Sequence, residues 1–387
     1  MRLLVVTQDF PPAVGGIETY TSELVQRWAD RPGAVHVVAP QLEGAASVDA
    51  DMPLPVTRVA TRPDFLPLSG VASVVRTARS LRPDVAFHTQ WQTRGASFLA
   101  RRLTGHPRRV VCAAHGRELL FNPVDRVPGL SALYNTLRRL LLRVPDRLTP
   151  VSRYTAGLLQ DLGVVAARLR VVPNGTDPER FQPFDASALR RSLGLDGQTI
   201  LLTVGRLVPR KGIDTTLEAL PALLDAVPDL TYLVVGTGPD RDRLERLAAD
   251  LDVRDLVRFT GEVSFEDLPH YYNIADAFAM PSREAPPDVE GFGIVFLEAG
   301  ACGVPVVGAR SGGVPDAVRD GETGLLVPPS SPDALAEALT RLLTSPDLAE
   351  RLGRQARHAV VHDASWAHIA DQLWDVFAAE AERAPAP

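Results

Sequence analysis

The sequence predicts an α/β fold made of two Rossmann-like, doubly wound domains. At 387 residues the chain exceeds the roughly 250–300 residues over which a single hydrophobic core grows. Short apolar runs alternate with helical patterns, which is typical of parallel sheets with crossover helices. A strand, a glycine loop and a helix open each half of the chain, and four positions of this unit are identical: Thr7, Gly16, Ile17 and Thr19 match Thr203, Gly212, Ile213 and Thr215. This repetition favours two similar domains.

The predicted strands are the short apolar, β-branched runs. In the first half they cover residues 3–7, 35–39, 56–59, 85–88, 110–113, 148–151 and 169–172. In the second half they cover residues 200–204, 232–235, 257–260, 275–280, 305–307 and 325–327. The Pro-rich, aperiodic segment 178–185 between the halves predicts the domain boundary.

The composition excludes several classes of protein. The net charge of −6 argues against a general nucleic-acid binder. Cys112 and Cys302 are the two cysteines, and both lie in apolar runs, which predicts reduced core residues. No apolar run reaches the roughly 18 residues of a membrane span, and the N-terminal run is too short for a signal peptide. We therefore expect a cytoplasmic protein.

Two carboxylates, Glu290 and Glu298, flank the segment Gly291-Phe292-Gly293 between two predicted strands. Eight residues of helix leave two side chains about 80° apart, so one helix face does not present both. Glu290 is therefore expected in the loop before a helix and Glu298 within its early turns. Both would then lie at the carboxyl end of a parallel sheet, where open α/β folds bind ligands. An acid that only complements a helix dipole is the alternative.

A basic glycine loop follows the first predicted strand of the second half. Arg206 and Lys211 project from this loop, after Gly205 and before the helix that begins near Gly212. Fixed cations with a helix N-terminus behind them suit a diphosphate, because they stabilise negative charge on a departing phosphate. A solvated basic loop is the alternative interpretation.

Two further glycine loops follow predicted strands. Gly15 and Gly16 begin the first helix, where the absence of a side chain lets a phosphate approach the backbone. The loop with Gly236 and Gly238 lacks the third glycine of the dinucleotide-binding fingerprint, so NAD binding is not expected. An ordinary strand-to-helix turn is the alternative for Gly15 and Gly16.

His115 ends a buried strand and is followed by glycine. A histidine at the carboxyl end of a parallel strand favours contact with a ligand, against the alternative of a structural histidine.

Two Asp-x-Asp triplets could in principle hold a divalent metal on a diphosphate. Asp49-Ala-Asp51 is expected in an aperiodic loop, and Asp240-Arg-Asp242 at a helix start, where acids complement the dipole. Neither context predicts a metal site, so no metal or other cofactor is expected.

The spacing Glu-x7-Glu around Gly-Phe-Gly, followed by Glu-Ala-x-Ala-x-Gly-x-Pro-Val-Val, resembles the retaining GT-B glycosyltransferases of the glycosyltransferase 4 family. Residues 288–298 and the His-Gly-x-Glu of residues 115–118 are most similar to bacterial phosphatidylinositol mannosyltransferases. The resemblance implies two Rossmann-like domains that face each other across a cleft. It also implies transfer of a hexose from a nucleotide diphosphate sugar, GDP-mannose or a UDP-sugar, to a hydroxyl acceptor such as a glycolipid, saccharide or polyol.

The resemblance also implies a role for individual residues. Glu298 would hold the ribose and Glu290 the transferred sugar, while Arg206 and Lys211 would take the leaving diphosphate. His115 would contact the sugar from the first domain. The glycine loops would line the donor, together with the Gly-Phe-Gly segment: Gly15, Gly16, Gly205, Gly236, Gly238, Gly291, Phe292 and Gly293. No residue stands out as a covalent nucleophile.

The expected domains are residues 1–178 for the acceptor, residues 179–365 for the donor, and a C-terminal segment, residues 366–387. By the resemblance, a helix in this last segment returns to the first domain, and the chain ends in a frayed tail. Eight arginines of the first domain could favour peripheral contact with anionic lipid, against the alternative of a solvated arginine face: Arg94, Arg101, Arg102, Arg108, Arg109, Arg138, Arg139 and Arg143.

Two other functions share this fold. A sugar-nucleotide epimerase would epimerise its donor with no acceptor present. A non-catalytic nucleotide-sugar binding protein would keep the cleft without the charged residues, and the presence of Glu290, Glu298, Arg206 and Lys211 argues against it.

Overall fold

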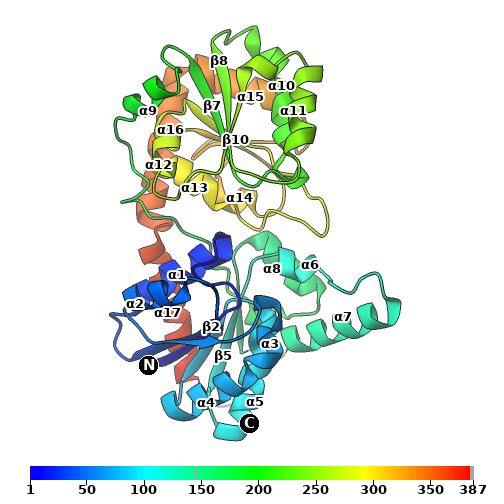
Figure 1. The fold of residues 1–387 in the computed structure, drawn as a ribbon, viewed down its shortest axis with the longest axis vertical. Helices are drawn as coiled ribbons and strands as arrows, with labels where there is room; N and C mark the ends of the chain where they lie inside the picture. The colour runs from blue at the N-terminus through cyan, green and yellow to red at the C-terminus, as the bar shows by residue number, and fades with distance from the viewer. Residues whose placement is uncertain (144–145, 384–387) are drawn as a thin grey trace. The chain divides into compact units, whose positions relative to one another are not determined.

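The computed structural model describes residues 1–143 and 146–383, so the predicted frayed tail at residues 384–387 lies outside the described residues. The chain forms two compact units (Figure 1). Unit 1 contains Met1–Asn174 and the chain from Trp366 onward, and unit 2 contains Gly175–Ser365. The chain passes between the units at two points, and these lie side by side, because the Thr176 N–H donates to the Ala364 carbonyl and Thr176 bridges Ser365.

Unit 1 is built on a six-stranded parallel sheet in the order β3-β2-β1-β4-β5-β6. This is the doubly wound order in which the chain reverses direction between β1 and β4. The strands are β1 (Arg2–Val6), β2 (Ala34–Pro40), β3 (Val56–Val59), β4 (Val85–His88), β5 (Arg109–Ala114) and β6 (Arg147–Pro150).

Helices cover both faces of this sheet. They are α1 (Gly16–Trp28), α2 (Ala45–Asp51), α3 (Leu66–Ser69), α4 (Val71–Leu81), α5 (Arg94–Thr104), α6 (Arg117–Leu120), α7 (Pro128–Arg143), α8 (Arg153–Asp161) and α17 (Trp366–Glu382), with the short 3-10 turns η1 (Pro63–Phe65), η2 (Trp91–Thr93) and η3 (Ala166–Arg168).

Adjacent residues of β4 face opposite sides of the sheet, as the strand period of two requires. Ala86 packs into the cluster formed with α4 and α5. Phe87 points to the other face, where its ring lies 5.1 Å from that of Phe377 in α17 and 5.8 Å from that of Trp28 in α1. The strands are apolar along their whole length because both faces are covered.

Unit 2 repeats the arrangement with a sheet in the order β12-β11-β10-β7-β8-β9. All its pairings are parallel among the strands β7 (Thr199–Val204), β8 (Leu230–Val235), β9 (Val257–Gly261), β10 (Ala277–Met280), β11 (Val306–Ala309) and β12 (Leu325–Val327). The two sheets therefore have one topology, and the prediction of two Rossmann-like domains is confirmed.

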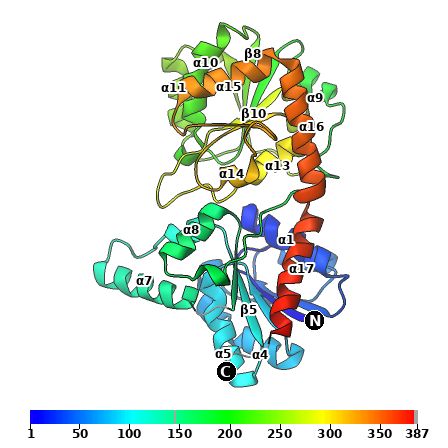
Figure 2. The same cartoon turned by 180° about the vertical axis from the view of Figure 1, so that it is seen from behind.

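The helices of unit 2 again lie on both faces of its sheet, as the two opposite views show (Figure 2). They are α9 (Ser187–Ser192), α10 (Ile213–Leu224), α11 (Arg241–Asp250), α12 (Leu268–Asn273), α13 (Ile294–Ala301), α14 (Val314–Ala317), α15 (Pro332–Thr344) and α16 (Pro346–Asp363), with η4 (Pro209–Lys211) and η5 (Arg254–Leu256). The apolar cluster between the sheet and α10 and α15 includes Leu217, Leu335 and Leu339.

One predicted strand is wrong. Residues 169–172 run beside β6, and the N–H groups of Arg170 and Val172 donate to the carbonyls of Leu148 and Pro150. The pairing does not extend further than one isolated bridge, because Pro173 follows directly and has no N–H to continue it.

Helix α17 is held in unit 1 by buried contacts along its length. The Trp28 indole N–H donates to the Ala370 carbonyl over 3.0 Å, and the Arg147 guanidinium binds the buried Glu380 carboxylate over 2.8 Å. Phe377 is fully buried between Trp28 and Phe87.

We predict that Phe377→Ala lowers the free energy of unfolding of unit 1 by about 3–5 kcal/mol, because it removes a large buried side chain and leaves a cavity. All four tryptophans of the chain lie in unit 1, so tryptophan fluorescence in a denaturant titration follows this unit. Leu68→Ala, at a side chain that is 78% exposed, is the matched control and is expected to change little. Equal effects of the two substitutions would contradict the packing described here.

Candidate functional site

Three loops of unit 2 meet at the carboxyl ends of neighbouring strands: residues 205–212 after β7, residues 281–293 after β10 and residues 310–313 after β11. Gly212 has a φ of 69°, and a β-carbon there would strike the Pro281 carbonyl. A β-carbon on Gly312 would likewise strike the Glu290 carbonyl, which accepts a hydrogen bond from the Gly313 N–H. Glycine at these positions lets the three loops pack in backbone contact.

A buried ion cluster joins the first two loops. The Glu290 carboxylate accepts from the Lys211 ammonium over 2.7 Å and from the Arg210 guanidinium. Asp288 lies 3.1 Å from Nε of Arg210. The Lys211 and Glu290 side chains are only 10% and 12% exposed. Two carboxylates and two cations thus form a compact, largely desolvated group, which we call the Glu290 cluster.

The pairing governs the ionisation of its members. Burial alone would raise the pKa of Glu290, but Lys211 and Arg210 outweigh it and lower that pKa to about 2. Burial lowers the pKa of Lys211, and Glu290 opposes this. Glu290 is therefore ionised at neutral pH and holds both cations in place.

The structure separates the two cations that the sequence places together. Lys211 extends over Gly205, since a β-carbon on Gly205 would lie 3.4 Å from Cε of Lys211. The Arg206 side chain is exposed instead. Arg210, which the sequence analysis did not select, occupies the place beside Lys211, because the 3-10 turn η4 carries both residues toward Glu290.

Glu298 lies inside α13, with Glu290 in the loop before it, as the spacing predicts. Its carboxylate accepts from the Tyr272 hydroxyl over 2.6 Å. Burial raises the pKa of Glu298 to about 7, against the opposing effects of Tyr272 and Lys211. Tyr272, in α12, was missed because nothing in the sequence connects it with α13.

The Gly-Phe-Gly segment shapes the start of α13. Gly291 and Phe292 are buried, and Gly293 caps the helix with a φ of 96°. A β-carbon on Gly293 would press on the Phe296 ring and approach the Glu290 side chain. The segment therefore sets the path by which the chain leads from Glu290 into the helix that carries Glu298.

Gly236 and Gly238 pack the loop after β8 against the loop after β7. A β-carbon on either glycine would strike the backbone of Gly205 or Leu207. The Leu207 N–H donates to the Thr237 carbonyl over 2.9 Å. These contacts account for both glycines by loop packing, and direct contact with a nucleoside stays a prediction.

In unit 1, Gly15 and Gly16 stand at the N-terminus of α1. A β-carbon on Gly16 would meet no atom within 4 Å, whereas one on Gly15 would strike the Glu18 carboxylate, so the backbone is open at Gly16 and covered at Gly15. The free N–H groups of a helix N-terminus attract anions.

His115 lies at the end of β5, between Thr89 and Tyr20. Its Nε2 is 3.0 Å from the Thr89 carbonyl, and the Tyr20 ring packs edge-on at 4.9 Å. A carbonyl only accepts hydrogen bonds, so Nε2 carries the proton. Burial lowers the pKa of His115, and the neutral ring leaves Nδ1 as a hydrogen-bond acceptor.

Two acids near His115 were missed by the sequence analysis. Glu118 accepts from the His115 N–H over 2.7 Å and fixes the turn after β5. Asp9, just after β1, accepts from the Gln90 side chain over 2.6 Å. Burial, and the nearby carboxylates of Glu18 and Asp64, raise the pKa of Asp9 to about 6. The position of Asp9 at a strand end was the available signal.

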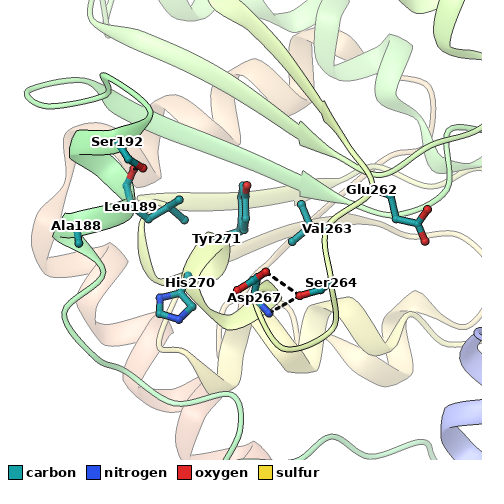
Figure 3. Close-up of a pocket in the computed structure, with 9 residues that line it drawn as sticks. All are labelled: Ala188, Leu189, Ser192, Glu262, Val263, Ser264, Asp267, His270 and Tyr271. Carbon is teal, nitrogen blue, oxygen red and sulfur yellow. Dashed lines mark hydrogen bonds between the residues drawn. The ribbon is translucent and has the colours of Figure 1, made fainter.

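A hollow of about 600 Å³ lies elsewhere in unit 2, between α9 and the loop from β9 into α12 (Figure 3). Its lining includes Glu262 and Asp267, and Asp267 accepts from the Ser264 hydroxyl over 2.8 Å. An acidic lining does not suit a diphosphate, and this hollow contains no residue predicted for the site.

The Asp-x-Asp triplets have structural partners. Asp49 lies in α2, so the expected loop is wrong, and its carboxylate binds the Arg58 guanidinium over 2.7 Å. Asp240 caps α11 and binds Arg243 over 2.7 Å. Within the described ranges 1–143 and 146–383, no group of three or more His, Cys, Asp or Glu side chains is placed to hold a metal ion.

The chain matches two families over most of its length. Residues 14–180 match the family described as Glycosyltransferase Family 4, and residues 185–359 match Glycosyl transferases group 1. Together with the paired parallel sheets, these matches define a glycosyltransferase that uses a nucleotide sugar. The chain belongs to the glycosyltransferase 4 family and has the GT-B architecture.

Characterised relatives are similar over nearly the whole chain. The GDP-mannose-dependent alpha-(1-6)-phosphatidylinositol monomannoside mannosyltransferase of Mycobacterium tuberculosis is 39% identical over 386 residues, 97% of each chain. The enzyme of the same name from Mycolicibacterium smegmatis is 38% identical over 375 residues, 94% of this chain and 95% of the relative. The D-inositol 3-phosphate glycosyltransferase of Actinosynnema mirum is 43% identical over 330 residues, 78% of this chain and 74% of the relative.

Solved structures share the fold. Anabaena HepE in complex with UDP has a TM-score of 0.81 at 22% identity and covers 98% of this chain and 100% of its own. Sucrose-phosphate synthase from Thermosynechococcus elongatus has a TM-score of 0.79 at 24% identity, with 98% of each chain covered. None of the helices in the described part of the chain is long and apolar enough to span a bilayer.

We predict that Glu298→Gln becomes more stable relative to the unsubstituted protein as pH rises. Between the ordinary carboxyl pKa and about 7, folded Glu298 keeps a proton that the unfolded chain releases, so its contribution to the free energy of unfolding falls with rising pH. Glutamine has no such loss. The free energy of unfolding of Glu298→Gln, minus that of the unsubstituted protein, should therefore rise by about 2–3 kcal/mol between about pH 4.5 and pH 8. Calorimetry of the unfolding of unit 2 measures it.

Glu262→Gln is the matched control, because that carboxylate is exposed, and its stability difference should change little with pH. If the stability difference between Glu298→Gln and the unsubstituted protein stays constant or falls as pH rises, Glu298 does not hold a proton in the folded protein as described here.

Proposed function

We propose that the protein transfers mannose from GDP-mannose to a hydroxyl of an acceptor that carries inositol phosphate, with retention at the anomeric carbon and without a metal ion. The Glu290 cluster is the observation that supports this best. It fixes the Lys211 ammonium in a desolvated loop that also carries Arg206, and preorganised cations of this kind are what a leaving nucleoside diphosphate requires when no metal neutralises it.

The donor half of the proposal rests on unit 2. Lys211 and Arg206 take the leaving diphosphate, with Arg210 keeping Glu290 ionised and in place. Glu290 contacts the transferred sugar, and Glu298 accepts from the ribose hydroxyls. A carboxyl whose pKa lies near 7 releases its proton at neutral pH with little cost in free energy, and the ribose hydroxyls can then donate to the carboxylate. The ribose therefore suits the buried Glu298.

Unit 1 supplies the remaining contacts in this proposal. Gly16 offers backbone N–H groups to a phosphate, and Nδ1 of His115 accepts from a sugar hydroxyl. Asp9 and Gln90 lie at the ends of β1 and β4, beside the His115 that ends β5. Hydroxyl-rich acceptors such as inositol are bound by carboxylate and amide groups of this kind.

The relatives support the donor and the class of acceptor. The mannosyltransferases and the inositol 3-phosphate enzyme share, by their names, an acceptor built on inositol phosphate. The mannosyltransferases that cover almost the whole chain are named for GDP-mannose.

We predict that the charged residues divide by kinetic role. Lys211→Met and Arg206→Ala should lower kcat by about 10²–10³ at saturating GDP-mannose, because the cations face charge that grows as the sugar departs. Glu298→Ala should mainly raise the donor KM, because the ribose is held equally before and during transfer. Steady-state kinetics with a phosphatidylinositol mannoside acceptor measure both, and NMR of the product gives its anomeric configuration.

Arg246→Met, at an exposed arginine of α11, is the control and should behave as the unsubstituted enzyme. The same assay in excess EDTA is expected to lose less than about twofold in rate. The assignment of roles is wrong if Lys211→Met changes only KM. A loss beyond tenfold in EDTA that magnesium or manganese restores would overturn the metal-free mechanism.

A further inference from the structure

A second ion network joins the loops around the candidate site, beside the Glu290 cluster. It is centred on Asp214, which lies in the first turn of α10, directly after the loop that carries Lys211. The Asp214 carboxylate binds two guanidinium groups from other segments of unit 2, those of Arg283 and Arg243. The Asp214 side chain is only 10% exposed, so these ion pairs are largely desolvated. The proposed contacts with the donor do not use this network.

Arg283 binds Asp214 through both branches of its guanidinium. Its Nη1 donates to Oδ1 over 2.8 Å and its Nη2 donates to Oδ2 over 2.7 Å. Two parallel charge-assisted hydrogen bonds of this kind fix orientation as well as distance. The Arg283 backbone N–H also donates to the Arg210 carbonyl over 2.8 Å. Arg283 therefore attaches the start of the loop after β10, residues 281–293, to both α10 and η4.

Arg243 provides a second connection, from α11. Its Nη2 donates to Asp214 over 2.9 Å and to Asp240 over 2.7 Å. Asp240 follows the loop after β8, and its N–H donates to the Leu207 carbonyl over 3.2 Å. The Arg243 side chain is 45% exposed and that of Arg283 is 24% exposed, so solvent weakens the connection through Arg243 more. Asp214 thus links the loops after β7, β8 and β10.

The network keeps Asp214 ionised. Burial alone would raise the pKa of Asp214, but the hydrogen bonds from Arg283 and Arg243 outweigh it and lower that pKa. A carboxylate in the first turn of a helix also complements the helix dipole, which is the alternative role for Asp214. A partner of the dipole needs no guanidinium, whereas Asp214 binds two from different segments.

We propose that Asp214 is a positioning residue for the transfer reaction. Through Arg283 it holds the loop after β10 against η4. This attachment brings Glu290 to Lys211 and fixes the Lys211 ammonium over Gly205. A cation that is held in place stabilises a departing phosphate without reorganising at the moment of transfer. The inference rests on the proposed function, in which Lys211 takes the leaving diphosphate.

Asp214→Asn tests the proposal, because asparagine keeps the shape of the side chain and removes its charge. At saturating GDP-mannose kcat should fall by about tenfold or more, while the donor KM changes less than about threefold, because the lost interaction is one that strengthens as charge develops. Arg283→Lys should lose as much, since an ammonium cannot form the bidentate pair. The double substitution should lose no more than either single one, because both break the same pair.

Hydrogen–deuterium exchange followed by mass spectrometry measures the attachment without any substrate. Asp214→Asn should speed exchange by about tenfold or more in peptides from residues 205–212 and 281–293. Unchanged exchange would show that Asp214 does not hold the loops, and faster exchange with unchanged kcat would show that holding them does not serve transfer. Either result overturns the proposal. If the unsubstituted protein transfers no mannose from GDP-mannose, the proposed function fails and the positioning role fails with it, whatever the exchange shows.

Asp276→Asn is the matched control. Asp276 lies just before β10, at the end of the strand opposite to the loop, and binds Arg190 over 2.8 Å and the Ile200 N–H over 2.7 Å. It should lower the stability of unit 2, measured by calorimetry, without changing kcat or the exchange of the two loops. A loss of kcat in this control equal to that of Asp214→Asn would show a general effect of destabilisation and would also overturn the proposal.

Discussion

The site of unit 2 depends on one interaction, the buried pairing of Glu290 with Lys211 and Arg210. Two cations side by side in a desolvated loop repel each other and lose hydration, so they persist only with a compensating anion. Glu290 provides it and stays ionised because of them. The cluster keeps positive charge next to Gly205 and holds the loops after β7 and β10 together. A site prepared in this way needs little reorganisation when a diphosphate leaves.

The two units show how one topology serves different chemistry. Each opens with a strand, a glycine loop and a helix, and the first helical turn carries Glu18 in unit 1 and Asp214 in unit 2. The loop of unit 2 holds Arg206, Arg210 and Lys211, whereas the only charged residue between β1 and α1 is Asp9. This difference in charge is the reason why we propose that unit 2 binds the anionic donor and that unit 1 binds the hydroxyl-bearing acceptor.

Most of the fold could be predicted from the sequence, because strands buried on both faces are apolar throughout and alternate with helices. The prediction of a strand at residues 169–172 was wrong, since a short run of this kind, in which only Val172 is buried, can pair through a few hydrogen bonds without forming a strand. The site was harder to predict from the sequence. Arg206 and Arg210 are both basic residues of one loop, and only the turn η4 decides which one meets Glu290. The raised pKa of Asp9 depends on carboxylates that folding brings together from distant parts of the chain.

The central claim is that Lys211 of the Glu290 cluster binds the diphosphate of the donor. Calorimetric titration with GDP and with guanosine, on the unsubstituted protein and on Lys211→Met, tests it most directly. The account predicts that the substitution weakens GDP binding at least tenfold, about 1.4 kcal/mol, while guanosine binding is unchanged. Unchanged GDP binding, or an equal loss for GDP and guanosine, would contradict it.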